Sequence, residues 1–289
     1  MSRTESRQLD GRVIAITGGA RGIGEATAKA LRTARARVVI GDVDEAAGEA
    51  TAQRLGLEAF FPLDVTDPES FAEFIRQSES TVGPLDALIN NAGIMPVGPL
   101  LDEDDPTARR VIDINVHGVI TGTKLAIRAM RGRGSGHIVN IASMAGVASV
   151  PGLATYNASK FAVVGFTDAV RLEVQPLGID VSSILPYFVN TELAAGTTGP
   201  RGFKKAEPVQ VAQAIVATLE RPVPRVYVPR ATGNMVRVFR KLPQAWTERL
   251  NSAMGGDQIF LGGVDHHARA AYERRARGLE AAQPPSDRA

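Results

Sequence analysis

The chain of 289 residues contains no cysteine and only four histidines. It therefore has no disulfides, no thiol nucleophile and no cysteine-based metal site, which excludes a secreted scaffold held together by disulfides. None of the histidines belongs to an HExxH motif or a similar ligand spacing, so we expect no metal site.

Long hydrophobic runs and a strong charge imbalance are also missing. No stretch approaches the roughly 18 consecutive apolar residues that span a bilayer, and the N-terminal residues MSRTESRQLDGR contain no signal-peptide-like apolar run. The formal net charge of +2 is too small to indicate a nucleic-acid partner. We therefore expect a soluble, cytoplasmic protein.

Hydrophobic residues make up 44% of the chain, a share typical of a globular protein with a sizeable core. Apolar runs predict seven buried strands, at residues 12–17, 37–42, 58–65, 85–93, 136–143, 178–186 and 225–229. Helical patterns lie between them, at residues 24–35, about 44–55, about 68–82, 104–131, 154–175 and 207–221. Apolar strands that alternate with helices predict an α/β fold, a doubly wound (Rossmann-type) parallel sheet covered on both faces.

We expect a single domain over residues 9–229, a helical extension over 230–272 and a disordered tail over 273–289. Apolar residues recur at helical spacing in the extension: Met235, Val238, Phe239, Leu242, Trp246 and Leu250. Seven arginines or lysines lie between residues 221 and 250 against one acid, Glu248. Such a segment either packs against its own domain or a second subunit, or makes peripheral contact with an anionic membrane. Pro243 interrupts the helix in either case.

The stretch ITGGARGIG, residues 16–24, lies between a predicted strand and a predicted helix. Its glycines, Gly18, Gly22 and Gly24, let the backbone turn sharply and approach a pyrophosphate, whose charge meets the amides of the helix N-terminus. The alternative is a strand-to-helix turn that simply requires glycine.

Asp42 ends the second predicted strand and favours the nucleotide interpretation. A carboxylate there accepts hydrogen bonds from the ribose 2′- and 3′-hydroxyls and repels a 2′-phosphate, so NAD is preferred over NADP. Arg21 is the counter-evidence, because a guanidinium can pair with a 2′-phosphate. Its other interpretation is a solvated loop charge.

Ser143, Tyr156 and Lys160 form the predicted catalytic set. Tyr156 and Lys160 are four residues apart and share one face of a helix, and Ser143 ends a strand at the edge where such sheets bind ligands. An ammonium about 4–5 Å from a phenolate contributes about 3–4 kcal/mol at an effective dielectric constant of about 20. Together with a nicotinamide cation, this brings the expected pKa of Tyr156 to about 7–8, suited to proton exchange with an alcohol. Ser143 holds the substrate oxygen.

These motifs, in this order, resemble the Tyr-dependent short-chain dehydrogenase/reductase family over residues 9–229. The resemblance rests on TGGARGIG (17–24), NNAG (90–93), Asn115, Ser143 and YNASK (156–160). It implies an oxidoreductase that transfers a hydride between NAD(H) and the carbinol or carbonyl carbon of a hydrophobic alcohol or ketone. It also implies a homodimer or homotetramer formed through the helices at about 104–131 and 154–175.

The resemblance implies further site residues. Asp64 and Val65 flank the adenine, and the Val189 backbone and Thr191 hydroxyl anchor the carboxamide. Asn115 joins the catalytic set, in a helix distorted to hold a water that links Lys160 to solvent. Without the resemblance, Asn115 is an ordinary polar helix residue. The implied cofactor set is Gly18, Arg21, Gly22, Ile23, Gly24, Asp42, Val43, Asp64, Val65, Asn91, Ala92, Gly93, Lys160, Pro186, Val189 and Thr191. After Pro186 the family usually has glycine, but this chain has Tyr187, which leaves the loop conformation open.

Apolar residues are expected around the substrate: Met95, Val97, Met144, Val147, Leu153, Tyr187 and Phe188. They suit a sterol, a retinoid or a long-chain hydroxyacyl compound; alternatively, several of them only pack the core. The glycine-rich segment 194–205 is a candidate substrate lid. An NADP(H)-dependent ketone reductase, a dehydratase or epimerase that uses NAD transiently, and a non-catalytic NAD-sensing or scaffold protein are the competing hypotheses.

Overall fold

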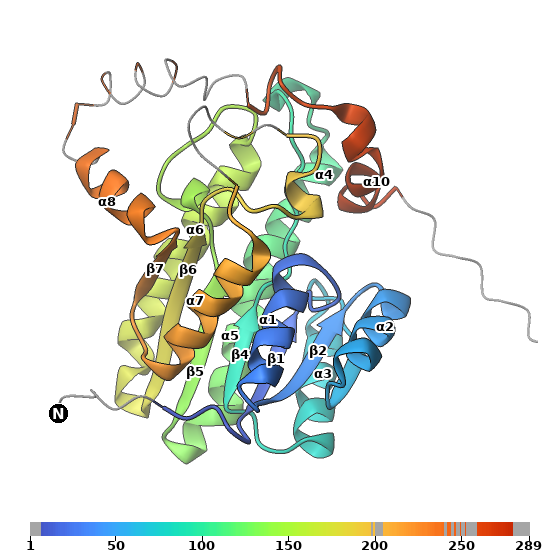
Figure 1. Ribbon diagram of the computed structural model, residues 1–289, viewed down its shortest axis with the longest axis vertical. Helices are drawn as coiled ribbons and strands as arrows, with labels where there is room; N and C mark the ends of the chain where they lie inside the picture. Colours follow the sequence, from blue (N-terminus) through green and yellow to red (C-terminus); the bar gives the residue numbers. More distant parts are fainter. Residues whose placement is uncertain are drawn as a thin grey trace, which may run out of the picture.

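The computed structural model describes residues 7–197, 199, 205–239, 242–243, 246, 249, 252 and 259–279. A parallel sheet of seven strands, in the order β3-β2-β1-β4-β5-β6-β7, forms its centre (Figure 1). The strands are β1 Val13–Thr17, β2 Arg37–Asp42, β3 Ala59–Pro62, β4 Ala87–Asn90, β5 Gly136–Ile141, β6 Ile179–Pro186 and β7 Arg225–Val228. The predicted doubly wound sheet of parallel strands is confirmed.

Helices cover both faces of this sheet, as the apolar character of its strands requires. One face packs against α3 Pro68–Thr81, α5 Gly118–Met130 and α6 Ala154–Val174 through a core that includes Phe71, Met130 and Val174. The other face packs against α1 Gly22–Thr33, α2 Glu45–Leu55 and α7 Pro208–Glu220. The strand order reverses between β1 and β4, so a crevice forms at the carboxyl ends of these strands, where such sheets bind ligands.

The segment 104–131 is helical but is not one regular helix. It consists of α4 Asp105–Ile112, a π-helical turn η2 Asp113–His117, and α5. The buried Asn115 side chain lies in this turn and donates hydrogen bonds to the Ile94 carbonyl and the Ser159 hydroxyl at 2.9 and 3.1 Å. The distorted turn therefore points one amide toward the loop that follows β4.

The C-terminal extension contains two described helices, α8 Arg230–Phe239 and α10 His266–Ala276. The expected start of a disordered tail at residue 273 is wrong, because residues 273–276 belong to α10. Asp265 caps the start of this helix, Glu273 pairs with Arg269 and Arg277, and Ala276 is buried. Residues 280–289, Leu250 and the side chain of Phe239 lie outside the described residues. No helix in the described ranges is long and apolar enough to cross a membrane.

Candidate active site

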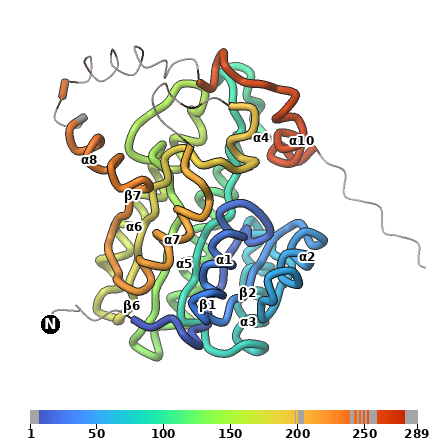
Figure 2. The backbone as a smooth tube through the Cα atoms, in the orientation of Figure 1, coloured from blue at the N-terminus to red at the C-terminus, as the bar shows by residue number. Residues whose placement is uncertain are grey.

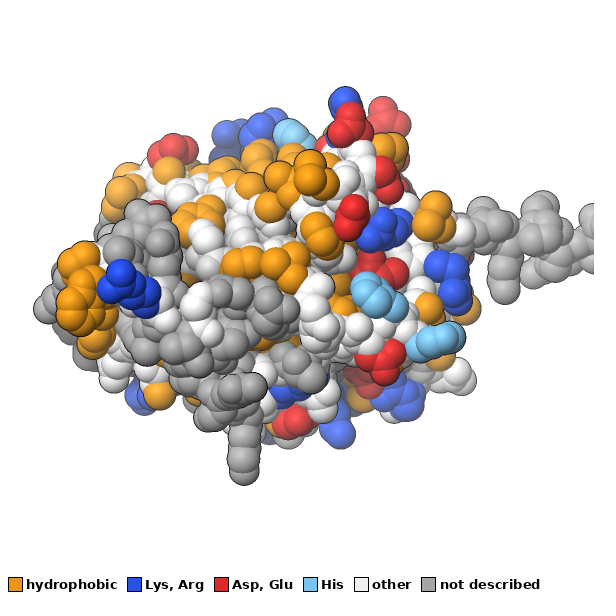
Figure 3. Space-filling view, turned by 90° about the horizontal axis from the view of Figure 1, so that it is seen from above, with side chains coloured by type: hydrophobic (Ala, Val, Ile, Leu, Met, Phe, Trp, Pro, Cys, Tyr) orange, Lys and Arg blue, Asp and Glu red, His pale blue; other side chains and the backbone are white. Residues whose placement is uncertain are grey.

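A cavity of about 730 Å³ lies at the carboxyl ends of the strands. The loops after β1 to β6 line it, together with α6, α8 and α10. Viewed onto this edge (Figure 3), hydrophobic side chains show across the middle of the face, and charged and histidine side chains gather toward the α10 end. One cavity thus contacts both the glycine loop and the predicted catalytic set.

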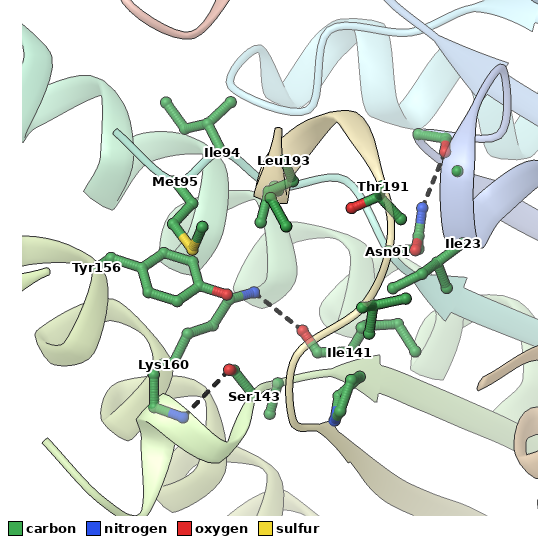
Figure 4. Close-up of a pocket in the computed structure, with 18 of the residues that line it drawn as sticks. Ile23, Asn91, Ile94, Met95, Ile141, Ser143, Tyr156, Lys160, Thr191 and Leu193 are labelled. Atoms are coloured by element: carbon green, nitrogen blue, oxygen red, sulfur yellow. Dashed lines mark hydrogen bonds between the residues drawn. The ribbon is translucent and has the colours of Figure 1, made fainter. Parts of the chain in front are cut away.

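The glycine loop forms one wall of the cavity and leaves no room for side chains. Gly18 and Gly22 have φ angles of +65° and +57°, which favour glycine. A Cβ on Gly24 would lie 2.1 Å from the Gly18 carbonyl oxygen, and one on Gly18 would lie 2.9 Å from Ala92 Cα. Asn91 Nδ2 donates to the carbonyls of Thr17 and Gly18, which ties the loop to the end of β4 (Figure 4).

The first turn of α1 faces this wall, and the N-cap residue Arg21 makes no side-chain capping bond to it. The backbone amides in the first turn of α1 are therefore available to an anion. The N-terminal end of the helix dipole also favours a negative charge at this turn. The close backbone packing and these amides fit the pyrophosphate of a dinucleotide.

Asp42 projects into the same cavity from the end of β2. Its carboxylate accepts hydrogen bonds from the amides of Ala20 and Asp44 at 3.0 and 3.1 Å, while burial raises its pKa. Arg21 forms an ion pair with Asp44 at 2.6 Å, a contact that the sequence interpretation missed. Arg21 is therefore already paired with a carboxylate.

Ser143, Tyr156 and Lys160 meet on the opposite wall. Ser143 follows β5, and its hydroxyl accepts a hydrogen bond from the Ala145 amide at 3.1 Å. Tyr156 and Lys160 lie one turn apart on α6, and Lys160 Nζ is 5.6 Å from the centroid of the tyrosine ring. Lys160 donates to the Ile141 carbonyl at 3.0 Å, as Figure 4 shows. The three side chains therefore border one space above the end of β5.

Burial dominates the protonation of this set. It raises the pKa of Tyr156 to about 12, although the hydrogen bond with Ser143 lowers it, and it lowers the pKa of Lys160 to about 8. In the ligand-free protein, desolvation of the phenolate outweighs its stabilisation, and the ammonium faces the Ile141 carbonyl and the tyrosine ring. The pKa of about 7–8 expected for Tyr156 includes the effect of a bound nicotinamide cation and stays a prediction.

Most of the predicted binding residues line the cavity. These are Gly18, Arg21, Gly22, Ile23, Asp42, Val43, Asp64, Val65, Asn91, Ala92, Gly93, Pro186, Val189 and Thr191 of the cofactor set, and Met95, Met144, Val147, Leu153, Tyr187 and Phe188 of the substrate set. Three predicted residues do not line it. Gly24 provides close packing behind the loop, Asn115 holds the π-helical turn, and Val97 is buried in the adjoining apolar cluster. The expected substrate role of Val97 stays a prediction.

Several lining residues come from the extension, where the sequence offers no motif to identify them. They are Met235 and Val236 of α8, Ile259 and Phe260, and Tyr272, Arg275 and Ala276 of α10. The candidate lid, residues 194–205, is described only in part: Ala194–Thr197, 199 and 205 are described, and 198 and 200–204 lie outside the described residues. In the described part of the chain, no group of His, Asp or Glu side chains is placed to hold a metal ion.

Comparisons with known proteins point to one family. The family model described as short chain dehydrogenase matches residues 12–201. The chain is 35% identical to a 3-alpha-(or 20-beta)-hydroxysteroid dehydrogenase of Mycobacterium tuberculosis, over 73% of this chain and 83% of the relative. It is 38% identical to a trans-4-hydroxycyclohexanecarboxylate dehydrogenase of Sinomonas cyclohexanicum, over 70% of this chain and 81% of the relative.

Solved structures agree with this relationship. A short chain dehydrogenase/reductase from Burkholderia phymatum, in complex with NAD, matches with a TM-score of 0.73 at 27% identity, over 80% of this chain and 93% of that one. A 3-ketoacyl-(acyl-carrier-protein) reductase from Brucella melitensis, complexed with NADH, matches with a TM-score of 0.70 at 29% identity. The match covers 77% of this chain and 99% of that one.

Proposed function

Because the chain belongs to the short-chain dehydrogenase family, we propose that it oxidises a hydrophobic secondary alcohol, or reduces the matching ketone, with NAD(H) and with Tyr156 as general acid/base. The observation that carries this proposal is the single cavity that joins the glycine loop to Ser143, Tyr156 and Lys160. A binding protein needs the loop but not a buried tyrosine and lysine beside it.

The cavity residues fit a nicotinamide dinucleotide. The amides of the glycine loop and α1 would hold the pyrophosphate, and Asp42 would bind the adenosine ribose. Asp64 and Val65 would contact the edge of the adenine. Near the other end, the Val189 backbone and Thr191 would anchor the carboxamide, and Lys160 would bind the nicotinamide ribose. When bound, the nicotinamide ring supplies the chemistry of accepting or donating the hydride.

The chain's own residues handle the proton and the developing charge. Ser143 would hold the substrate oxygen by a hydrogen bond, which is strongest when that oxygen carries negative charge. With a pKa of about 12 in the ligand-free protein, Tyr156 keeps its proton at neutral pH, the form that donates to a ketone oxygen. Oxidation needs the reverse transfer, from the alcohol to the Tyr156 oxygen, and the cation of Lys160 favours it by stabilising the phenolate.

Apolar side chains around Tyr156 support a hydrophobic substrate. Met95, Leu153 and Phe188 form one buried cluster with Tyr156, and Ile259 and Phe260 of the extension join it. In Figure 4 the Met95 side chain lies beside the tyrosine ring. The relatives are named for a hydroxysteroid and for trans-4-hydroxycyclohexanecarboxylate, both of which are secondary alcohols that contain a ring system. We therefore favour a cyclic secondary alcohol of up to steroid size over a retinoid or a long-chain hydroxyacyl compound.

NAD is the proposed cofactor rather than NADP. The Asp42 carboxylate would meet the ribose hydroxyls and repel a 2′-phosphate. The guanidinium of Arg21, which could otherwise compensate, is paired with Asp44. Asp42 is itself fixed by two backbone amides, so it cannot easily turn away.

We expect a panel of apolar cyclic secondary alcohols to be oxidised with NAD, and at least about tenfold more slowly with NADP, since like-charge repulsion against the half-buried Asp42 carboxylate costs more than about 1 kcal/mol. NADH or NADPH absorbance measures both rates. Substitution of Asp42 by alanine should reduce the ratio of the rate with NAD to the rate with NADP. No turnover of any alcohol or ketone with either cofactor would refute the proposed function, while faster turnover with NADP would refute only the role of Asp42.

We also propose a homo-oligomer formed through α4, α5 and α6. The apolar side chains of Phe161 and Leu172 on α6 are 44% and 61% exposed in the single chain, and a partner chain would cover them.

A further inference from the structure

The C-terminal segment 259–279 forms part of the cavity wall, although it follows the part of the chain that the family model matches. Figures 1 and 2 show α10 above the carboxyl ends of the strands, next to α4. It contacts the short 3-10 turn η6 Glu192–Ala194, which follows β6. The matched region ends at residue 201, so this wall of the cavity is supplied by residues outside the shared motifs.

Arg269 fastens α10 to two loops of the active site. Its side chain is fully buried and donates hydrogen bonds to the carbonyls of Leu193 and Ala195 at 2.7 and 3.1 Å, and to the Met95 carbonyl. Glu273, one turn along α10, pairs with it at 2.5 Å. A buried guanidinium is tolerated only when its donors are satisfied in this way. The position of α10 is therefore fixed relative to Met95 and η6.

The backbone packing around the segment is equally close. A Cβ on Gly196 would lie 2.2 Å from the Asp265 carbonyl oxygen, and one on Gly152 would lie 2.8 Å from Phe260. Thr197 also forms a β-bridge with Val264. Such fits leave little freedom for the segment to sit elsewhere, so its side chains are a fixed part of the cavity wall.

Tyr272 presents a polar group from this wall. Its ring lies over the Arg269 guanidinium, 4.7 Å from centroid to carbon, and its hydroxyl oxygen accepts a hydrogen bond from the Met95 amide at 2.8 Å. Among the residues that the structure describes, nothing accepts the proton of this hydroxyl. Burial raises the pKa of Tyr272, and the proximity of Tyr156 raises it further, so the group stays protonated and remains a donor.

We propose that Tyr272 is a specificity-determining residue, and that Arg269 is the positioning residue that holds it. The ring bounds the substrate space beside Tyr156, and the hydroxyl donates a hydrogen bond to an acceptor on the substrate away from the reacting carbon. The substrate class is then a hydrophobic cyclic secondary alcohol that carries a second oxygen, such as a ketone. This inference rests on the proposed function, since it concerns the alcohol that Tyr156 would act on.

Two alcohols of steroid size test the inference: one with a ketone on the part of the ring system that lies beside Tyr272 when the carbinol carbon is at Tyr156, and its analogue with a methylene in place of that ketone. We expect wild type to prefer the ketone-bearing alcohol. Tyr272→Phe should reduce this preference in kcat/KM about tenfold, mainly through KM, because the donor is lost and the ring stays. Arg269→Lys should shift the preference in the same direction, and Tyr272→Ala should admit bulkier alcohols.

Arg274→Ala, an exposed position on the same helix, is the matched control and should change neither alcohol's kinetics. NADH fluorescence titration should give the same affinity for every variant, which separates a loss of specificity from a damaged fold. If wild type shows no preference, or Tyr272→Phe keeps it within twofold, the inference is wrong and the proposed function stands. If wild type oxidises neither alcohol nor any other in the panel, the proposed function fails and takes this inference with it.

Discussion

Replacing Tyr156 with phenylalanine is expected to lower kcat by about 10³-fold, within the range usual for loss of a general acid/base, while the affinity for NADH stays unchanged. The hydroxyl is the group placed beside Ser143 that can exchange a proton with the substrate oxygen. Its ring packs in the apolar cluster with Met95 and Leu153, so phenylalanine should preserve the packing. Steady-state kinetics and NADH fluorescence titration measure the two quantities.

Tyr187→Phe is the matched control, because Tyr187 also lines the cavity and has a pKa raised by burial. We expect it to keep kcat within about threefold of wild type, as an ordinary substitution away from the chemistry does. If Tyr156→Phe retained kcat within tenfold of wild type, the proton would have to come from elsewhere and the proposed mechanism would be wrong.

Lys160→Met is expected to abolish turnover yet make the ligand-free protein more stable at pH 7. Burial lowers the pKa of Lys160 from 10.5 to about 8, so keeping its charge in the folded state at pH 7 costs about 3 kcal/mol. Methionine removes this cost, but it also removes the hydrogen bond from Lys160 to the Ile141 carbonyl, which lowers the gain in unfolding free energy by about 1 kcal/mol. A net gain of about 2 kcal/mol raises Tm by several degrees in a chain of this size.

The pH dependence of Tm shows whether Lys160→Met stabilises the protein by removing a buried charge or by better packing. Below about pH 8 the lysine is charged in both the folded and the unfolded state, and its full penalty is present. Between about pH 8 and 10.5 the folded state has released the proton that the unfolded state still holds, so wild type regains stability as the pH rises. The Tm advantage of Lys160→Met should therefore shrink from pH 7 to pH 10.

Thermal unfolding of wild type, Lys160→Met and Lys124→Met at several pH values measures this effect. Lys124 is exposed on α5, so its substitution should leave the unfolding free energy within about 0.5 kcal/mol of wild type. A lower Tm for Lys160→Met at pH 7 would mean that the lysine is not destabilising, and a Tm advantage independent of pH would assign it to packing.

The central strands β1, β4 and β5 could be predicted closely because they are buried on both faces and appear in the sequence as continuous apolar runs, whereas the edge strands β3 and β7 are only partly buried. The second strand was predicted at residues 37–42, and β2 spans Arg37–Asp42. The catalytic trio could be predicted to converge because parallel strands end at one edge and because Tyr156 and Lys160 share a helical face. Both expectations depend on local periodicity alone.

Other features depend on contacts between distant segments, which periodicity does not reveal. The π-helical turn at Asn115 depends on its bonds to Ile94, and the place of α10 depends on Arg269 and the carbonyls it binds. From the sequence alone, the charged residues of α10 are interpreted as part of a solvated tail, because the carbonyl groups that Arg269 binds are far away in the chain. Spacing likewise predicts the charge of Lys160 near Tyr156, but not the desolvation that raises the pKa of Tyr156 in the ligand-free protein.

Transfer of deuterium from the alcohol to the cofactor tests the proposed reaction most directly. A cyclic secondary alcohol carrying deuterium at its carbinol carbon would be mixed with the enzyme and NAD for a single turnover, and the reduced cofactor analysed by mass spectrometry. We expect the deuterium to appear in the reduced cofactor, on one face of its ring, with none released to solvent. Reduced cofactor that contains no deuterium would contradict hydride transfer in this cavity.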